Sequence, residues 1–231
     1  MSSILITGAN RGIGLEFTAQ YAAAGWRVLA ACRDPSETGD LRRIAEAAGG
    51  AVSLHRLEVT DPQSIRRLAD ELSSQPVDLL LNNAGVAGRE AANFGQTPAK
   101  PWLDTLAVNV VAPMHMAEAF LPHVQRSERR IIATISSRMG SVGENDQGGS
   151  YAYRSSKAAV NAVAKNLSVE MKNKGITVVV LHPGWVRTDM GGPEAPVSPE
   201  ESVTGLKGVL DKVTLADTGK FLNYDGTEIP W

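Results

Sequence analysis

Residues 3–14 read Ser-Ile-Leu-Ile-Thr-Gly-Ala-Asn-Arg-Gly-Ile-Gly, a short apolar run that passes directly into a cluster of glycines. The run has the composition of a buried strand, and the residues from Ile13 onward have the pattern of a helix. Glycines at a strand–helix junction let the backbone turn tightly and approach a pyrophosphate, which the free N–H groups of the helix can bind. The spacing is Gly-x-x-x-Gly-x-Gly rather than Gly-x-Gly-x-x-Gly, and a glycine cluster alone can also be a purely structural turn.

Short apolar runs alternate with longer amphipathic stretches along the chain, the pattern of βαβ units around a parallel sheet. We expect strands at Ser3–Thr7, Arg27–Ala31, Ala51–Glu58, Val77–Asn82, Arg129–Ile135, Thr177–His182 and Lys220–Asn223. We expect helices at Ile13–Ala24, Asp40–Ala48, Pro62–Ser73, Trp102–Gln125, Ser150–Asn173 and Pro199–Lys212. The sequence therefore predicts an α/β fold: one doubly wound Rossmann domain over residues 1–231, with a central parallel sheet of about seven strands and helices on both faces.

Composition narrows the class of protein. The 231 residues and 43% hydrophobic content suit one large domain, and a net charge of −2 gives no electrostatic case for a nucleic-acid partner. No apolar run approaches the ~20 residues of a membrane span, and the opening Met-Ser-Ser carries no leader features. We therefore expect no membrane partner and a cytoplasmic protein. The single cysteine, Cys32, excludes an internal disulfide and a cysteine-rich metal site.

The end of the second predicted strand bears on cofactor choice. A site that selects NAD often has an acidic residue there for the ribose 2′-hydroxyl, whereas this chain has Arg33. Arg11, inside the glycine turn, can converge on the same point, and two arginines can hold a 2′-phosphate by forked, charge-assisted hydrogen bonds. The alternatives are two solvated surface arginines, or an Arg33 neutralised by Asp34. NADP(H) is favoured over NAD(H).

Tyr153 and Lys157 lie at i and i+4 of a predicted helix and so project from one face. A free tyrosine has a pKa of about 10, which suits proton transfer at neutral pH poorly. A cation ~4 Å away contributes roughly 4 kcal/mol at an effective dielectric of ~20, equivalent to ~3 pKa units before desolvation opposes it. Such a pair also arises by chance. Tyr151 is the rival tyrosine, but Ser155 and not a lysine follows it four residues later.

Further motifs occur in a fixed order along the chain. They are Thr7-Gly-Ala-Asn-Arg-Gly-Ile-Gly14, Asn82-Asn-Ala-Gly85, Asn109 within Val-Asn-Val, Ser136-Ser137, Tyr153-x-x-x-Lys157 and Pro183-Gly184. On these motifs the chain resembles the short-chain dehydrogenase/reductase family from residue 4 to nearly its C-terminus. The stretch Ser-Ser-Arg-Met-Gly140 and the ending Phe221-Leu-Asn-Tyr-Asp-Gly226…Pro230-Trp231 resemble the branch with bacterial C-factor proteins and sniffer-type carbonyl reductases.

The resemblance implies a catalytic tetrad of Asn109, Ser137, Tyr153 and Lys157. Tyr153 would protonate the carbonyl oxygen as hydride arrives, and Ser137 would hold the same oxygen by a hydrogen bond. Lys157 would lower the pKa of Tyr153 and bind the nicotinamide ribose. Asn109 would hold a water that links Lys157 to solvent. Ser136 and Ser137, taken singly, can also be simple turn residues.

The same resemblance implies the cofactor contacts. They are Gly8, Asn10, Arg11, Gly12, Ile13, Gly14, Arg33, Glu58, Val59, Asn83, Ala84, Gly85, Tyr153, Lys157, Pro183, Gly184, Val186 and Thr188, and no metal is required. Glu58 stands where the family usually has Asp, so its hydrogen bond to the adenine amino group is in doubt.

The sequence therefore predicts an NADP(H)-dependent oxidoreductase that interconverts a small-molecule carbonyl and an alcohol. The alternative is a cofactor-binding signalling or sensor protein of C-factor type with little or no turnover. We expect a homodimer or homotetramer paired through the helices at Trp102–Gln125 and Ser150–Asn173. Four apolar side chains can either line the substrate pocket or belong to the hydrophobic core: Trp185, Met139, Met190 and Phe94.

Overall fold

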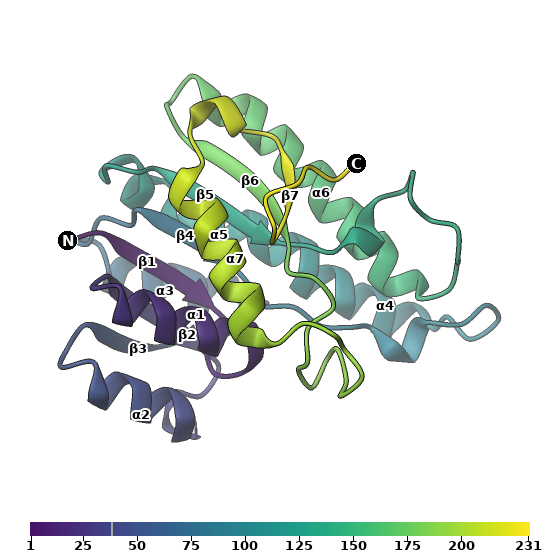
Figure 1. Ribbon diagram of the computed structural model, residues 1–231, viewed down its shortest axis with the longest axis horizontal. Coiled ribbons are helices and arrows are strands. Elements are labelled where there is room, and N and C mark those ends of the chain that lie inside the picture. The colour runs from purple at the N-terminus through teal and green to yellow at the C-terminus, as the bar shows by residue number, and fades with distance from the viewer. Residues whose placement is uncertain (38) are drawn as a thin grey trace.

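The computed structural model describes residues 1–37 and 39–231 and contains one seven-stranded sheet (Figure 1). All strands are parallel, in the order β3-β2-β1-β4-β5-β6-β7. Their bounds are β1 Ser3–Thr7, β2 Arg27–Cys32, β3 Val52–Arg56, β4 Leu79–Asn82, β5 Ile131–Ile135, β6 Thr177–His182 and β7 Phe221–Asn223. The predicted fold class and the seven predicted strands are confirmed.

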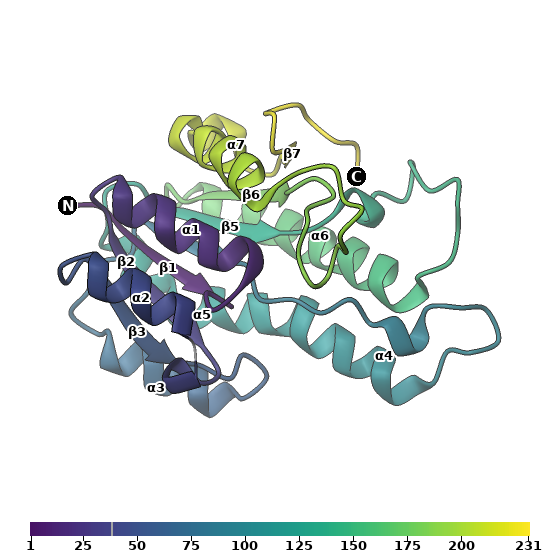
Figure 2. The same cartoon turned by 60° about the horizontal axis from the view of Figure 1, so that its bottom comes forward.

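Helices cover both faces of this sheet (Figure 2). Their bounds are α1 Gly12–Ala23, α2 Gly39–Ala47, α3 Pro62–Glu71, α4 Ala99–Leu106, α5 Ala112–Gln125, α6 Tyr151–Lys172 and α7 Pro199–Lys212. One apolar core joins α1, α2 and α7 to their face of the sheet, and a second joins α3, α5 and α6 to the other. Strands buried on both faces explain the continuous apolar runs in the sequence.

The helix predicted over Trp102–Gln125 differs from the structure in two ways. It starts earlier, at Ala99, and a π-helical segment at Ala107–Val111 divides α4 from α5. Pro113 has no N–H, so the carbonyl of Asn109 four residues before it receives no α-helical hydrogen bond. A wider turn around Asn109 is the local response to that missing donor.

The topology places the chemistry at one edge of the sheet. Because all strands run the same way, the segments that follow β1, β2, β4, β5 and β6 meet where the strands end. The chain leaves β1 toward β2 on one side, while β4 lies on the other side, and a ligand crevice is expected at such a reversal. Among the described residues, none of the helices has the length and apolar character needed to cross a membrane.

Candidate active site

The glycine turn after β1 is held firmly against the segment after β4. The backbone N–H groups of Asn83 and Ala84 both donate to Thr7 Oγ1 at 3.0 Å. The Asn83 amide donates back to the carbonyls of Thr7 and Gly8, at 2.9 and 3.2 Å. The motifs pointed to Asn83 but assigned nothing to Thr7, whose hydroxyl joins the two segments.

Three glycines in this turn are required by its geometry. Gly8 and Gly12 have φ of +69° and +52°, where other residues are strained. A Cβ on Gly14 would lie 2.2 Å from the Gly8 oxygen and 2.5 Å from the Asn83 amide nitrogen. The glycines therefore let the turn pack closely against the segments after β4 and β6, directly before the N-terminus of α1.

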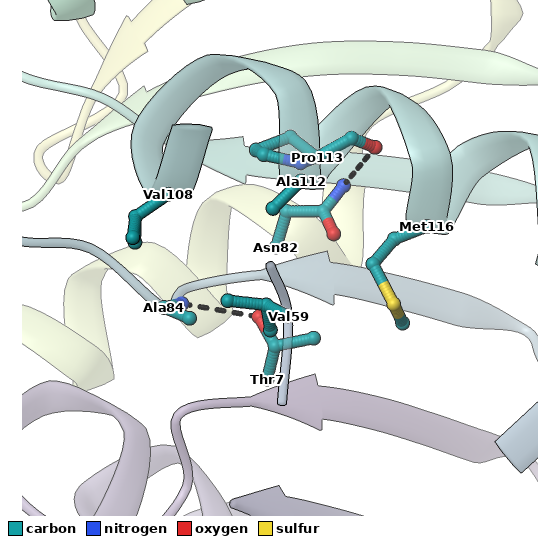
Figure 3. Close-up of a pocket in the computed structure, with 8 residues that line it drawn as sticks. All are labelled: Thr7, Val59, Asn82, Ala84, Val108, Ala112, Pro113 and Met116. Carbon is teal, nitrogen blue, oxygen red and sulfur yellow. Dashed lines mark hydrogen bonds between the residues drawn. The ribbon is translucent and has the colours of Figure 1, made fainter. Parts of the chain in front are cut away.

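A small, mostly apolar pocket opens beside this turn (Figure 3). It is lined by Thr7, Val59, Asn82, Ala84, Val108, Ala112, Pro113 and Met116. Val59 and Ala84, two expected cofactor contacts distant in sequence, lie together in it. The hollow is closely packed, and its lining is mainly apolar.

Two expected cofactor residues have other partners. Glu58 Oε1 accepts from the N–H of Thr60 at 3.0 Å and from its hydroxyl at 2.7 Å, so its carboxylate is turned toward its own loop. Arg11 pairs with Asp189 at 3.1 Å rather than converging with Arg33, whose exposed side chain follows β2. The expected hydrogen bond from Glu58 to an adenine amino group stays a prediction.

The segment after β6 lies across the glycine turn. The carbonyl of Pro183 accepts from the Ser202 hydroxyl at 2.6 Å, and Gly184, at φ +85°, packs against the ring of Tyr224. Val186 is buried, and a Cβ on Gly12 would lie 3.2 Å from the methyl group of Thr188. The structure thus brings the expected residues after β1 and β6 together.

On α6, Tyr153 and Lys157 face the end of β5. Ser137 lies beside the Tyr153 phenol, and Ser137 Oγ accepts from the N–H of Met139 at 3.2 Å. Lys157 Nζ lies 5.6 Å from the centroid of the Tyr153 ring and donates to the carbonyl of Ile135 at 2.9 Å. These side chains form one site, as the motifs predicted.

The two adjacent serines have different surroundings. Ser136 Oγ donates to Asn161 Oδ1 at 2.6 Å and is directed into the core, away from Tyr153. Ser137 belongs to the site. A Cβ on Gly140 would lie 2.7–2.9 Å from backbone and Cβ atoms of Lys157, so this glycine lets the turn with Ser137 pack directly on α6.

Electrostatics at the site differ from the expectation that Lys157 lowers the pKa of Tyr153. Burial raises the pKa of the Tyr153 phenol, and the hydrogen bond from Ser137 only partly opposes this. Burial also lowers the pKa of Lys157 to about 8. Desolvation therefore sets the direction of both pKa shifts, and the Lys157 ammonium donates to the Ile135 carbonyl.

The side-chain amide of Asn109 is held by three hydrogen bonds. Its Nδ2 donates to the Val86 carbonyl and to Ser156 Oγ, and its Oδ1 accepts from the Val86 N–H, all at 2.9 Å. The amide thus ties the segment after β4 to α6 and has no donor left for a water. The water expected at Asn109 stays a prediction, and the main-chain carbonyl, which receives no hydrogen bond from Pro113, could accept from one.

The surroundings of individual side chains decide two questions that the sequence left open: which tyrosine belongs to the site, and whether Phe94 and Trp185 are core residues. Tyr151 is 37% exposed at the start of α6, whereas Tyr153 contacts Ser137. Phe94 and Trp185 are 90% and 57% exposed, so neither is ordinary core. No group of three or more metal-ligating side chains gathers within the described part of the chain.

A known family of proteins matches most of this chain. Residues 2–197 match the family model described as short chain dehydrogenase. The chain belongs to the short-chain dehydrogenase family. It is 41% identical to the C-signal protein of Myxococcus xanthus over 167 residues, which are 72% of this chain and all of that protein.

Solved structures of carbonyl reductases match this chain over its whole length. The carbonyl reductase Sniffer of D. melanogaster is 34% identical, with a TM-score of 0.93 and full coverage of both chains. The NADPH-bound carbonyl reductase from chicken fatty liver is 36% identical, with a TM-score of 0.90 and coverage of 100% of this chain and 99% of that one. The resemblance read from the motifs, including its branch, is confirmed.

The pKa of Lys157 gives a prediction about stability. Between pH ~8 and ~10.5 the unfolded chain keeps a proton that the folded chain has lost, so this lysine makes stability rise with pH in that window. Relative to Lys157→Met, the wild type should gain up to about 1.4 kcal/mol per pH unit there. Urea unfolding of both proteins from pH 7 to 9.5 measures this, and a pH-independent difference would contradict it.

Proposed function

We propose that this short-chain dehydrogenase is an NADP(H)-dependent oxidoreductase that interconverts a small-molecule carbonyl and an alcohol. The observation that carries the proposal is the Tyr153 phenol, which lies beside Ser137 and one helical turn from the buried Lys157. This group stands at the edge of the sheet where the glycine turn lies. A proton donor beside a phosphate-binding turn supports carbonyl reduction with a nicotinamide cofactor.

The residues at the glycine turn fit such a cofactor. Gly8 and Gly12, at positive φ, set the tight turn that leads into the N-terminus of α1, where free N–H groups can bind a pyrophosphate. Gly85 lies close to Lys157 Nζ, since a Cβ there would be 3.7 Å from it. That proximity supports Lys157 as a ligand of the nicotinamide ribose.

The proposed chemistry divides between three side chains. When bound, the reduced nicotinamide supplies the hydride for the carbonyl carbon. Ser137 holds the carbonyl oxygen by a hydrogen bond, and Tyr153 gives that oxygen its phenolic proton as negative charge develops. Lys157, as an ammonium, stabilises the resulting phenolate. A water on the Asn109 carbonyl then returns a proton from solvent toward Lys157 and Tyr153.

NADP(H) preference rests on Arg33 and Arg11. We expect Arg33→Ala and Arg11→Ala each to weaken NADPH binding about tenfold, because each removes a charge-assisted hydrogen bond to the 2′-phosphate. NADH, which lacks that group, should lose less than about twofold. Fluorescence titration of each variant with both cofactors measures the losses, with Arg66→Ala, an exposed arginine on α3, as control. Equal losses for both cofactors would mean that these arginines do not read the 2′-phosphate.

A second candidate function is a sensor whose output is cofactor occupancy. The 41% identity with the C-signal protein favours it. The complete arrangement of Ser137, Tyr153 and Lys157 argues for turnover, since occupancy alone needs no proton donor.

One experiment separates the two candidates. The purified protein is titrated with NADPH and NADH, and NADPH oxidation is then followed against a panel of aliphatic and aromatic aldehydes and ketones. Tight NADPH binding with turnover supports the oxidoreductase. Tight binding without turnover on any carbonyl or alcohol would favour the sensor, and no binding of either cofactor would refute both.

A further inference from the structure

The segment between β6 and α7 forms a folded tongue, defined here as residues 188–195 (the yellow-green loop before α7 in Figure 1). Its base is closed by a bridge between Val186 and Val197, and the Arg187 N–H donates to the Val197 carbonyl at 2.9 Å. Within it, the N–H of Gly192 donates to the carbonyl of Thr188 at 2.8 Å. The tongue is therefore a defined structural element and holds its exposed side chains in place.

Two arginines from opposite sides hold this tongue at Asp189. Arg11, in the glycine turn, pairs with the Asp189 carboxylate at 3.1 Å. Arg89, after β4, donates to the main-chain carbonyls of Asp189 and Met190 at 3.4 and 2.9 Å. The carboxylate of Asp189 thus accepts from Arg11, while its main-chain carbonyl accepts from Arg89.

We propose that Asp189 competes with the 2′-phosphate of NADP(H) for Arg11 and is therefore a specificity-determining residue of the cofactor site. This inference rests on the proposed function, in which Arg11 reads that phosphate. Arg11 directs its Nη1 to the Asp189 carboxylate, and a 2′-phosphate can use that edge of the guanidinium only by displacing the carboxylate. While Arg11 is paired with Asp189, the cofactor must either displace the carboxylate or bind without this arginine.

The competition is weak enough to be reversible. Arg11 and Asp189 are 65% and 79% exposed, and such ion pairs are worth little in water. A phosphate monoester carries more charge than a carboxylate near neutral pH and displaces it. Asp189 thus lowers the fraction of molecules in which Arg11 is available, and the apparent NADPH affinity falls by that fraction.

The test replaces Asp189 with Asn, which removes the charge but keeps the backbone carbonyls that Arg89 holds. We expect Asp189→Asn to tighten binding of NADPH about two- to sixfold and to leave NADH within about 1.5-fold of wild type, as release of a weak ion pair predicts. Titration with 2′,5′-ADP and with ADP checks the same ratio without the nicotinamide. Glu90→Gln, which removes an equal charge from the neighbouring loop, is the control for long-range repulsion.

A double-mutant cycle shows whether the effect passes through Arg11. In an Arg11→Ala background, Asp189→Asn should no longer change the ratio of NADPH to NADH affinity. An unchanged ratio in Asp189→Asn itself, a tightening that persists without Arg11, or a tightening matched by Glu90→Gln would each overturn the inference. If the wild type turns over NADPH while one of these results appears, only this inference fails. Failure of the wild type to bind either cofactor or 2′,5′-ADP would overturn both it and the proposed function.

Discussion

Tyr153→Phe is expected to bind NADPH within about twofold of wild type and to lose 10²–10⁴-fold, by order of magnitude, in kcat. The substitution keeps the ring, its packing on α6 and its place above Lys157, and removes only the proton donor. Without the phenol, the substrate oxygen keeps Ser137 as its one donor. Titration of NADPH and steady-state NADPH oxidation measure the two quantities separately.

Tyr151→Phe is the matched control for this prediction. Its ring lies two residues earlier on the same helix and is 37% exposed, and the phenol is absent from the Ser137 site. We expect its kcat to stay within about twofold of wild type, because no proposed proton transfer uses it. Full turnover in Tyr153→Phe, or loss of turnover in Tyr151→Phe instead, would remove Tyr153 from the mechanism.

The second large effect is expected at Gly14. An added methyl group would lie 2.2 Å from the Gly8 carbonyl oxygen and 2.5 Å from the Asn83 amide, and neither neighbour can move without breaking the link between β1 and β4. Gly14→Ala should lower the free energy of unfolding by about 1–3 kcal/mol. It should also weaken NADPH binding at least about tenfold, because the turn that faces the pyrophosphate is displaced.

Gly208→Ala supplies the comparison for Gly14→Ala. Gly208 lies inside α7, where no atom lies within 4 Å of an added Cβ, and alanine is the better helix residue there by about 1 kcal/mol. Urea unfolding and NADPH titration should show this variant at least as stable as wild type, with unchanged binding. If Gly14→Ala matches Gly208→Ala in both the free energy of unfolding and NADPH affinity, the glycine turn is looser than the structure shows.

The fold could be predicted from sequence because its signals are local. Each buried strand is a short apolar run, and these runs alternate with amphipathic stretches, which is the pattern of a parallel α/β sheet. The helix around Asn109 was harder to predict, because the apolar periodicity continues through the π-helical segment. Only Pro113, which lacks an N–H, indicates that segment in the sequence. The side chains on that segment also face different ways: Val108 lines the pocket, whereas Val111 is exposed. Pairing of two chains through these helices stays a prediction.

The sequence predicted which residues the candidate site brings together, but not all of their interactions. Spacing was enough to bring Tyr153 and Lys157 together, and motif order added Ser137. Spacing carries no information on desolvation, which sets the direction of the pKa of Tyr153. The partner of Arg11 lies 178 residues away in a loop, and no local pattern identifies such a contact.

Transfer of deuterium tests the central claim most directly. The protein is incubated with NADPH that carries deuterium at the transferable position of the nicotinamide and with a carbonyl from the panel, and the alcohol is analysed by mass spectrometry. The account predicts an alcohol with one deuterium on its carbinol carbon, formed by wild type and Tyr151→Phe and reduced by two or more orders of magnitude in Tyr153→Phe. An alcohol without deuterium, or equal yields from wild type and Tyr153→Phe, would contradict the account.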